Sequence, residues 1–291
     1  MATALHDHTY GITSDPLTQF AVVLSALIHD VDHRGVVSSL LNFDYLTIPL
    51  RKIASAHTAT TFHFFQPNFV LAQEEPGLAK VYNGKSIAEQ NSIDLAWRAL
   101  MDPAYEELRS CIYGNEAELQ RFRHLIVNSV LATDIFDKEL GQLRKNRWNK
   151  AFHEENSNDA GRDEVNRKAT IVIEHLIQAS DVSHTMQHWH IYQKWNMRLL
   201  EEMYASFKAG RWDKDPTVNW YEGEMGFFDN YVIPLAKKLK ECGVFGVASD
   251  EYLNYATENR REWEKKGQAA IEKFKAKFAP SDAPEETPKV I

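Results

Sequence analysis

The stretch Asp15-Pro16-Leu17-Thr18-Gln19-Phe20-Ala21-Val22-Val23-Leu24-Ser25-Ala26-Leu27-Ile28-His29-Asp30-Val31-Asp32-His33 joins a helical pattern to a group of metal-ligating residue types. Asp15 is typical of a helix N-cap, and Pro16 suits the first helical position. Apolar side chains then recur at helical spacing, at Phe20, Val23, Leu24, Leu27 and Ile28. The pattern predicts a helix over residues 15–33, and Gly35 is a stop signal.

The polar end of this stretch is typical of a divalent-metal site. His29 and Asp30 can reach one ion, and the carboxylate of Asp30 can bridge to a second ion. His33 lies one turn further on and would share the face of His29. The alternative is a helix C-terminus where imidazoles interact favourably with the negative end of the dipole. That alternative does not explain two aspartates, so we favour the metal site.

Two further carboxylates could complete such a site. Asp181 ends an apolar helical segment, and the alternative is an ordinary solvated turn at a helix end. Asp134 is predicted to lie on an apolar helix face, and the alternative is a buried carboxylate whose hydrogen bonds are satisfied. The residues alone leave both alternatives open.

The rest of the chain predicts an all-α protein without strands or internal repeats. Ser86 and Glu89 fit a capping box before one helix, and Asn115 can cap another. The remaining predicted helices cover residues 138–152, 164–180, 189–209, 217–240 and 249–278. The proline-rich residues 279–291 predict a disordered tail.

Bulk composition excludes several classes of protein. The formal net charge of −8 argues against a nucleic-acid partner. No apolar run approaches the length of a membrane span, and no signal peptide is visible. Cys111 and Cys242 are too few for a disulfide framework or a zinc knuckle. We expect two reduced thiols in a cytoplasmic protein.

Five blocks in this order resemble the catalytic domain of class I 3′,5′-cyclic nucleotide phosphodiesterases, which belong to the HD superfamily. A single His-Asp pair would not produce so specific a match. The blocks are His29-Asp30-Val31-Asp32-His33-Arg34-Gly35-Val36, Tyr82-Asn83-Gly84-Lys85-Ser86-Ile87-Ala88-Glu89, Leu131-Ala132-Thr133-Asp134, Ala179-Ser180-Asp181-Val182-Ser183, and Gly226-Phe227-Phe228-Asp229 with Pro234.

The resemblance implies a compact multi-helix domain over residues 1–278 with a binuclear metal site. It implies two divalent metals, zinc with magnesium or manganese. His29, Asp30 and Asp181 would hold the tighter metal, and Asp30 would bridge to the second. Paired cations would activate a water that attacks phosphorus.

The resemblance also implies roles for residues around the metals. His33, Glu89 and Asp134 would orient waters or metal ligands. For Glu89 we weigh this role equally with the alternative that its side chain belongs to the capping box. Phe227 would stack on the purine, although an aromatic residue at that spacing is by default a core residue.

Two departures from the family pattern concern chemistry. The family expects an H-N-x-x-H-A motif before the His-Asp pair, with the general-acid histidine and a further metal ligand. The sequence given starts at Met1 without it. The family's purine-binding glutamine aligns with Glu224, and an ionised carboxylate only accepts hydrogen bonds. The preference between adenine and guanine therefore stays open.

A third departure concerns residues 37–66, which interrupt the family pattern. Removing them joins Arg34-Gly35-Val36 to Pro67-Asn68-Phe69 and restores it. We interpret them as a translated intron, and the alternative is a genuine long loop. Sequenced messenger RNA would distinguish the two.

The sequence therefore predicts a cytoplasmic enzyme of signal transduction that hydrolyses cyclic AMP, cyclic GMP or both to 5′-monophosphates. One alternative is a catalytically impaired relic that binds a nucleotide or a partner. Another is a different metal phosphohydrolase of the HD type, which the blocks after residue 80 disfavour. Such domains are often fused to sensory, cyclase or membrane modules, and the sequence leaves the oligomeric state open.

Overall fold

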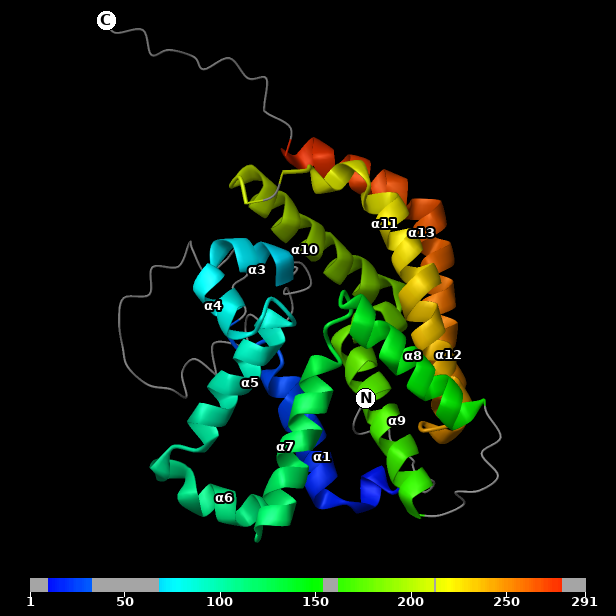
Figure 1. Ribbon diagram of the computed structural model, residues 1–291. Coiled ribbons are helices and arrows are strands. Elements are labelled where there is room, and N and C mark those ends of the chain that lie inside the picture. Colours follow the sequence, from blue (N-terminus) through cyan, green and yellow to red (C-terminus); the bar gives the residue numbers. More distant parts are fainter. Residues whose placement is uncertain (1–9, 33–67, 154–161, 212, 279–291) are drawn as a thin grey trace, which may run out of the picture.

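The computed structural model describes residues 10–32, 68–153, 162–211 and 213–278 (Figure 1). Helices form the regular structure of these ranges and no strand occurs in them, which confirms the all-α class. His33, residues 37–66 and the tail 279–291 lie outside the described residues. The predictions made for them stay predictions.

The N-terminal helices surround a small core between α1 (Pro16–Ile28), α5 (Ile87–Leu100) and α7 (Glu116–Leu131). Asn115 caps α7 as predicted, because its side chain accepts a hydrogen bond from the Glu118 amide at 3.0 Å. Phe122, Ile126 and Val130 of α7 pack against Ala21 and Ile28 of α1. Three short helices that the sequence did not predict complete this part: α3 (Asn68–Glu74), α4 (Pro76–Val81) and α6 (Glu106–Ile112).

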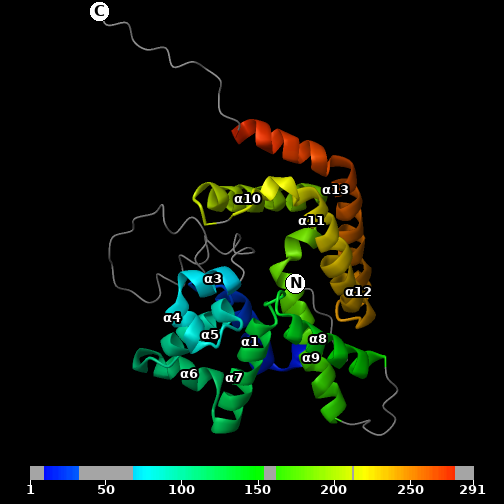
Figure 2. The same ribbon diagram turned by 45° about the horizontal axis from the view of Figure 1, so that its top comes forward.

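The larger core lies among the C-terminal helices, where α13 (Ser249–Phe278) runs beside α11 (Trp220–Phe227) and α12 (Ile233–Glu241) (Figures 1 and 2). The helices α8 (Lys138–Phe152), α9 (Arg162–Asp181) and α10 (Trp189–Lys208) close it. The predicted inner face of α9 is buried, including Ile171, Val172, Leu176 and Ala179. The bounds predicted for α8 and α13 are confirmed.

The predicted helix over residues 217–240 is wrong as a single α-helix. After α11, residues Phe228–Val232 form a π-helical turn (η7) in which the Ile233 amide bonds to the Phe228 carbonyl, five residues back. Pro234 has no amide hydrogen, and its ring would crowd the carbonyl four residues before it. The wider turn accommodates Pro234 and lets the chain continue as α12.

The first helix ends earlier than predicted, at Ile28 instead of His33. The Val31 amide bonds to the Ile28 carbonyl at 3.0 Å, which tightens the last turn. Asp32 then adopts a left-handed conformation with φ of 62°. His29 and Asp30 therefore lie in a turn after the helix. The helix α1 contacts α9, which belongs to the larger core.

Two other features concern the cysteine thiols and the apolar character of the helices. Cys111 is exposed, Cys242 is buried, and both are free thiols. Within the ranges given above, no helix is both long enough and apolar enough to cross a membrane.

Candidate metal centre and its surroundings

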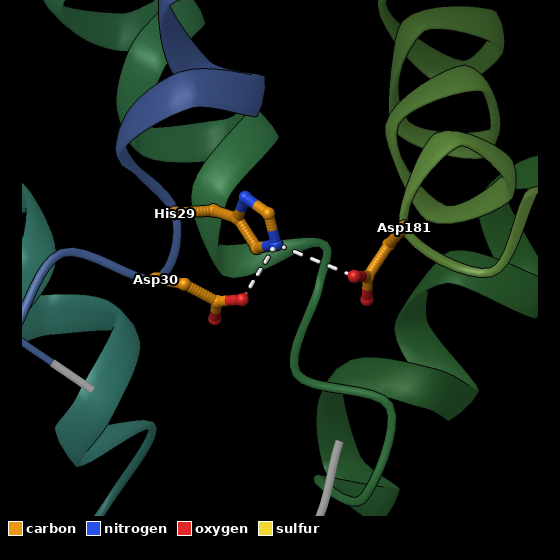
Figure 3. Close-up of side chains that lie close together, drawn as sticks. All are labelled: His29, Asp30 and Asp181. Atoms are coloured by element: carbon orange, nitrogen blue, oxygen red, sulfur yellow. Dashed lines mark hydrogen bonds and ion pairs between the residues drawn. The ribbon is translucent and has the colours of Figure 1, made fainter. Parts of the chain in front are cut away.

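His29, Asp30 and Asp181 converge although 151 positions separate Asp30 from Asp181 in the sequence (181 − 30 = 151). His29 Nε2 lies 3.2 Å from Asp30 Oδ2 and 3.3 Å from Asp181 Oδ1 (Figure 3). One ligand atom from each residue lies within 4.8 Å of the others. Among the described residues this is the only group of three or more such side chains that could hold a metal ion.

The backbone fixes which nitrogen of His29 faces the carboxylates. His29 Nδ1 lies 2.9 Å from the Ala26 carbonyl oxygen, which can only accept a hydrogen bond. Nδ1 therefore carries the proton, and Nε2 is the atom that faces the two aspartates. The Ser92 hydroxyl donates to the Val31 carbonyl at 2.8 Å and ties the following turn to α5.

The charges around His29 favour a cation beside its ring. Burial lowers the pKa of His29, but the carboxylates of Asp30 and Asp181 outweigh burial and raise it well above its ordinary value. Two carboxylates that share one imidazole nitrogen attract positive charge to that point. A proton or a metal ion can supply it.

The spacing of these atoms fits a divalent cation. A cation about 2.0–2.2 Å from a nitrogen and an oxygen ligand, at near-tetrahedral angles, keeps the two ligands roughly 3.3–3.6 Å apart. The distances of 3.2 Å and 3.3 Å from His29 Nε2 to the two carboxylate oxygens lie at the short end of this range. One imidazole with two carboxylates suits zinc, and the remaining carboxylate oxygens suit a harder ion such as magnesium or manganese.

Asp134 lies at the centre of a hydrogen-bond network. It follows the end of α7 in a loop and does not lie on the helix face that the sequence predicted. Its carboxylate accepts bonds from the Ser86 hydroxyl at 2.7 Å, the Asn68 amide at 3.1 Å, and the backbone amides of Phe136 and Asp137. The hydrogen bonds of the Asp134 carboxylate are therefore satisfied, as the alternative interpretation stated.

The predicted capping box of α5 is wrong. Ser86 has a left-handed backbone and makes no side-chain cap, because its hydroxyl donates to Asp134. Glu89 instead accepts a hydrogen bond from Asn68 Nδ2 at 3.0 Å. Asn68 thus holds Glu89 and Asp134 together, and its own Oδ1 accepts from the Ala88 amide.

Glu89 is electrostatically coupled to the metal cluster. Burial raises the pKa of Glu89 to about 7, and the charges of Asp134 and Asp30 raise it while the Asn68 hydrogen bond lowers it. The carboxyl therefore exchanges its proton near neutral pH. The charge of Asp30 thus links the protonation of Glu89 to the cluster.

The loop that carries Asp134 is held from two other helices, by residues that the sequence did not single out. Arg144 of α8 is buried and donates to the Asp134 carbonyl at 2.9 Å. Gln178 of α9 donates to the Ala132 carbonyl at 3.0 Å, one turn before Asp181. These contacts fix the loop relative to the end of α9.

Glu224 on α11 lies among hydrogen-bond donors with fixed orientation. Tyr192 donates its hydroxyl proton to Glu224 Oε2 at 2.8 Å, and Asn196 also hydrogen-bonds to this carboxyl. The Trp220 indole can only donate, and it does so to Asn196 Oδ1 at 3.1 Å, so the amide group of Asn196 faces Glu224. Burial raises the pKa of Glu224 to about 7.

Phe227 is partly exposed and lies three residues further along α11. Its ring stacks on that of Tyr231 with centroids 5.4 Å apart. Phe227 also packs against the larger core, so the core interpretation accounts for part of its surface. Glu224 and Phe227 therefore lie on one helix, and Tyr231 follows it in the π-helical turn. Burial and the Asp181 carboxylate raise the pKa of Tyr231.

Comparison with known proteins identifies relatives over most of the chain. A family model described as 3′5′-cyclic nucleotide phosphodiesterase matches residues 57–245. This range includes Glu89, Asp134, Asp181, Glu224 and Phe227 but begins after His29 and Asp30.

Three curated relatives illustrate the similarity. A human dual specificity calcium/calmodulin-dependent 3′,5′-cyclic nucleotide phosphodiesterase 1C is 23% identical over 185 residues, which cover 64% of this chain and 20% of the relative. The probable 3′,5′-cyclic phosphodiesterase pde-3 of Caenorhabditis elegans is 23% identical over 247 residues, with coverages of 79% and 34%. The probable 3′,5′-cyclic-AMP phosphodiesterase pde-4 of the same organism is 25% identical over 231 residues, with coverages of 75% and 29%. The chain thus spans between a fifth and about a third of these relatives.

Proposed function

The chain belongs to the 3′,5′-cyclic nucleotide phosphodiesterase family, and we propose on this premise that it hydrolyses 3′,5′-cyclic nucleotides to 5′-monophosphates with the help of divalent cations. The observation that carries the proposal is the convergence of His29, Asp30 and Asp181 on one point. Sequence similarity supports the substrate class, and the geometry supports the dependence on metal.

We assign the ligands by the chemistry of their atoms. Nε2 of His29 offers a lone pair because Nδ1 is held protonated by the Ala26 carbonyl. Asp181 and one oxygen of Asp30 would complete a zinc site, and the other oxygen of Asp30 would reach a magnesium or manganese ion. When bound, such a cation pair lowers the pKa of water and offsets the charge of the phosphate.

Glu89 and Asp134 have separate tasks in this proposal. Asp134 accepts four hydrogen bonds and fixes Ser86 and Asn68, so it acts as a positioning residue. Glu89, with a pKa of about 7, is suited to take up and release a proton near neutral pH. We propose that it exchanges protons with water at the centre, and His33 would assist as the sequence predicted.

The base of the nucleotide would bind along α11. Phe227 offers a partly exposed ring for stacking. Glu224 would meet the hydrogen-bonding edge of the purine. Below a pH of about 7 its carboxyl is neutral and both donates and accepts, whereas above it the carboxylate only accepts. The preference between cyclic AMP and cyclic GMP is therefore expected to depend on pH.

Hydrolysis of cyclic AMP and cyclic GMP, followed by ³¹P NMR with added Mn²⁺ or Mg²⁺, tests the proposal. The wild-type chain should form 5′-monophosphate, and a chelator should stop the reaction. Asp181→Asn should lower the rate by more than about a hundredfold, because it removes a ligand charge. Asp250→Asn is the matched control, since Asp250 is exposed and pairs with Lys240.

Other outcomes identify the alternatives. Binding of cyclic nucleotides without turnover would favour the impaired relic. Hydrolysis of a simple phosphodiester such as bis(p-nitrophenyl) phosphate, without hydrolysis of cyclic nucleotides, would favour another HD-type phosphohydrolase. The cytoplasmic location and the fusion to sensory, cyclase or membrane modules stay predictions.

A further inference from the structure

Tyr231 carries a buried hydroxyl that no described residue satisfies. The oxygen is inaccessible to solvent, and it has no hydrogen-bond partner among the described residues. Burial of an unpaired hydroxyl is unfavourable, so such a group calls for an explanation, such as a catalytic role or a bound water, ion or ligand. The Tyr231 hydroxyl can therefore donate a hydrogen bond to a partner from outside this part of the chain.

The backbone around Tyr231 has an unusual conformation. Tyr231 lies within the π-helical turn Phe228–Val232, and such turns occur frequently at functional sites. Its ring stacks on Phe227, with an angle of 19° between the planes. The stacked ring has little freedom to turn its hydroxyl elsewhere.

The charges near Tyr231 connect it to the candidate metal centre. Burial raises the pKa of Tyr231, the Asp181 carboxylate raises it further, and the Arg144 guanidinium lowers it. The hydroxyl therefore keeps its proton at neutral pH and remains a hydrogen-bond donor. Arg144 is itself bonded to the Asp134 carbonyl, and Tyr231 packs against the larger core, which includes Val182 next to Asp181.

The distance between Glu224 and Tyr231 along the chain is comparable to the length of a nucleotide. Seven residues of helix rise by roughly 10 Å, and this is comparable to the span of one nucleotide from its base edge to its phosphate. Phe227 lies between the two residues. A nucleotide whose base meets Glu224 and Phe227 would thus bring its phosphate toward Tyr231 and Asp181.

We propose that the Tyr231 hydroxyl donates a hydrogen bond to a phosphate oxygen of the nucleotide at the candidate metal centre. The inference rests on the proposed function, and it assigns to Tyr231 the recognition of the phosphate. The donor is neutral and the acceptor is charged, which makes the hydrogen bond a strong one.

Binding measurements on Tyr231→Phe, with Mn²⁺ present, test the inference. The dissociation constants of 5′-AMP and 5′-GMP are compared with those of adenosine and guanosine, which lack the phosphate. The variant should bind the preferred monophosphate about tenfold to a hundredfold more weakly and bind its nucleoside unchanged. Its melting temperature without ligand should stay the same or rise, because no hydrogen bond within the described chain is lost.

Tyr221→Phe is the matched control, since Tyr221 lies on α11 and its hydroxyl donates to the Glu264 carbonyl at the surface. It should leave both affinities unchanged. Equal affinities of Tyr231→Phe and wild type for the monophosphate, or equal weakening for monophosphate and nucleoside, would overturn the inference. If either of these results is found and the wild type still hydrolyses cyclic nucleotides, the inference about Tyr231 fails and the proposed function stands. A wild type that neither binds nor hydrolyses nucleotides overturns the proposed function as well.

Discussion

At the residue scale, Glu224 is a carboxyl that the fold keeps neutral up to about pH 7. The folded chain holds its proton between the ordinary pKa of 4.5 and the raised pKa of about 7, while the unfolded chain releases it. The folded state therefore binds more protons in this window. Stability conferred by this group is present at low pH and is lost as the pH rises through about 7.

Glu224→Gln should remove this pH dependence. Glutamine is neutral at every pH and accepts from Tyr192 through its amide oxygen. The variant should match the wild type near pH 4 and exceed it near pH 8 by up to roughly 3 kcal/mol in free energy of unfolding. Urea unfolding at both pH values measures the difference. Parallel curves would contradict the prediction, and Glu222→Gln, on the exposed face of α11, should show no such difference.

The residues of the candidate metal centre differ in how far the sequence predicts them. His29, Asp30 and Asp181 are ligand types at helix ends, so the sequence points to them without a structure. Asn68 and Ser86 gain their roles only from partners 21 to 66 positions away. Their residue types alone predict turns and caps, which is why the capping box was the natural and wrong interpretation of Ser86.

At the scale of elements, the long helices follow from the sequence and the short ones do not. Asp137 caps α8 through a hydrogen bond from the Leu140 amide at 3.0 Å, a local signal that fixes its start. The helices α3, α4 and α6 contain six or seven residues each. Helices this short have too few local interactions to form alone, so packing decides them. The π-turn before Pro234 likewise interrupts the single long helix that the pattern over residues 217–240 predicts.

Gly267 determines how closely α13 approaches α11. A Cβ at this position would lie 2.7 Å from Trp263 Cε2 and 2.9 Å from Tyr221 Cδ2. Trp263 is fully buried and stacks on Tyr221, so neither ring can move freely. The glycine therefore makes room for the indole that joins the two helices.

Gly267→Ala should destabilise the protein although alanine favours helices. Overpacking costs about 1–3 kcal/mol, against a gain of about 1 kcal/mol in helix propensity. Urea unfolding should show a net loss, whereas Gly141→Ala in α8, where a Cβ meets nothing within 4 Å, should show a gain. Equal stabilisation by both substitutions would contradict the packing described for α11 and α13.

At the scale of the whole molecule, the candidate metal centre lies between two cores. His29 and Asp30 follow α1 and the smaller core, whereas Asp181 ends α9 of the larger core. The helices α1, α7 and α9 contact one another at this junction. A cation held by all three side chains would bind only the folded arrangement and would therefore stabilise it. The all-α class follows from the sequence, but the meeting of α1 with α9 depends on packing across the chain.

The most direct test of the central claim is an anomalous difference map from crystals of the chain soaked in Mn²⁺. We predict a peak within about 2.0–2.3 Å of His29 Nε2 and of carboxylate oxygens of Asp30 and Asp181. The peak should vanish in Asp181→Asn crystals. A map without density between these three side chains, from crystals that hold manganese elsewhere, would contradict the metal centre on which the proposed hydrolysis depends.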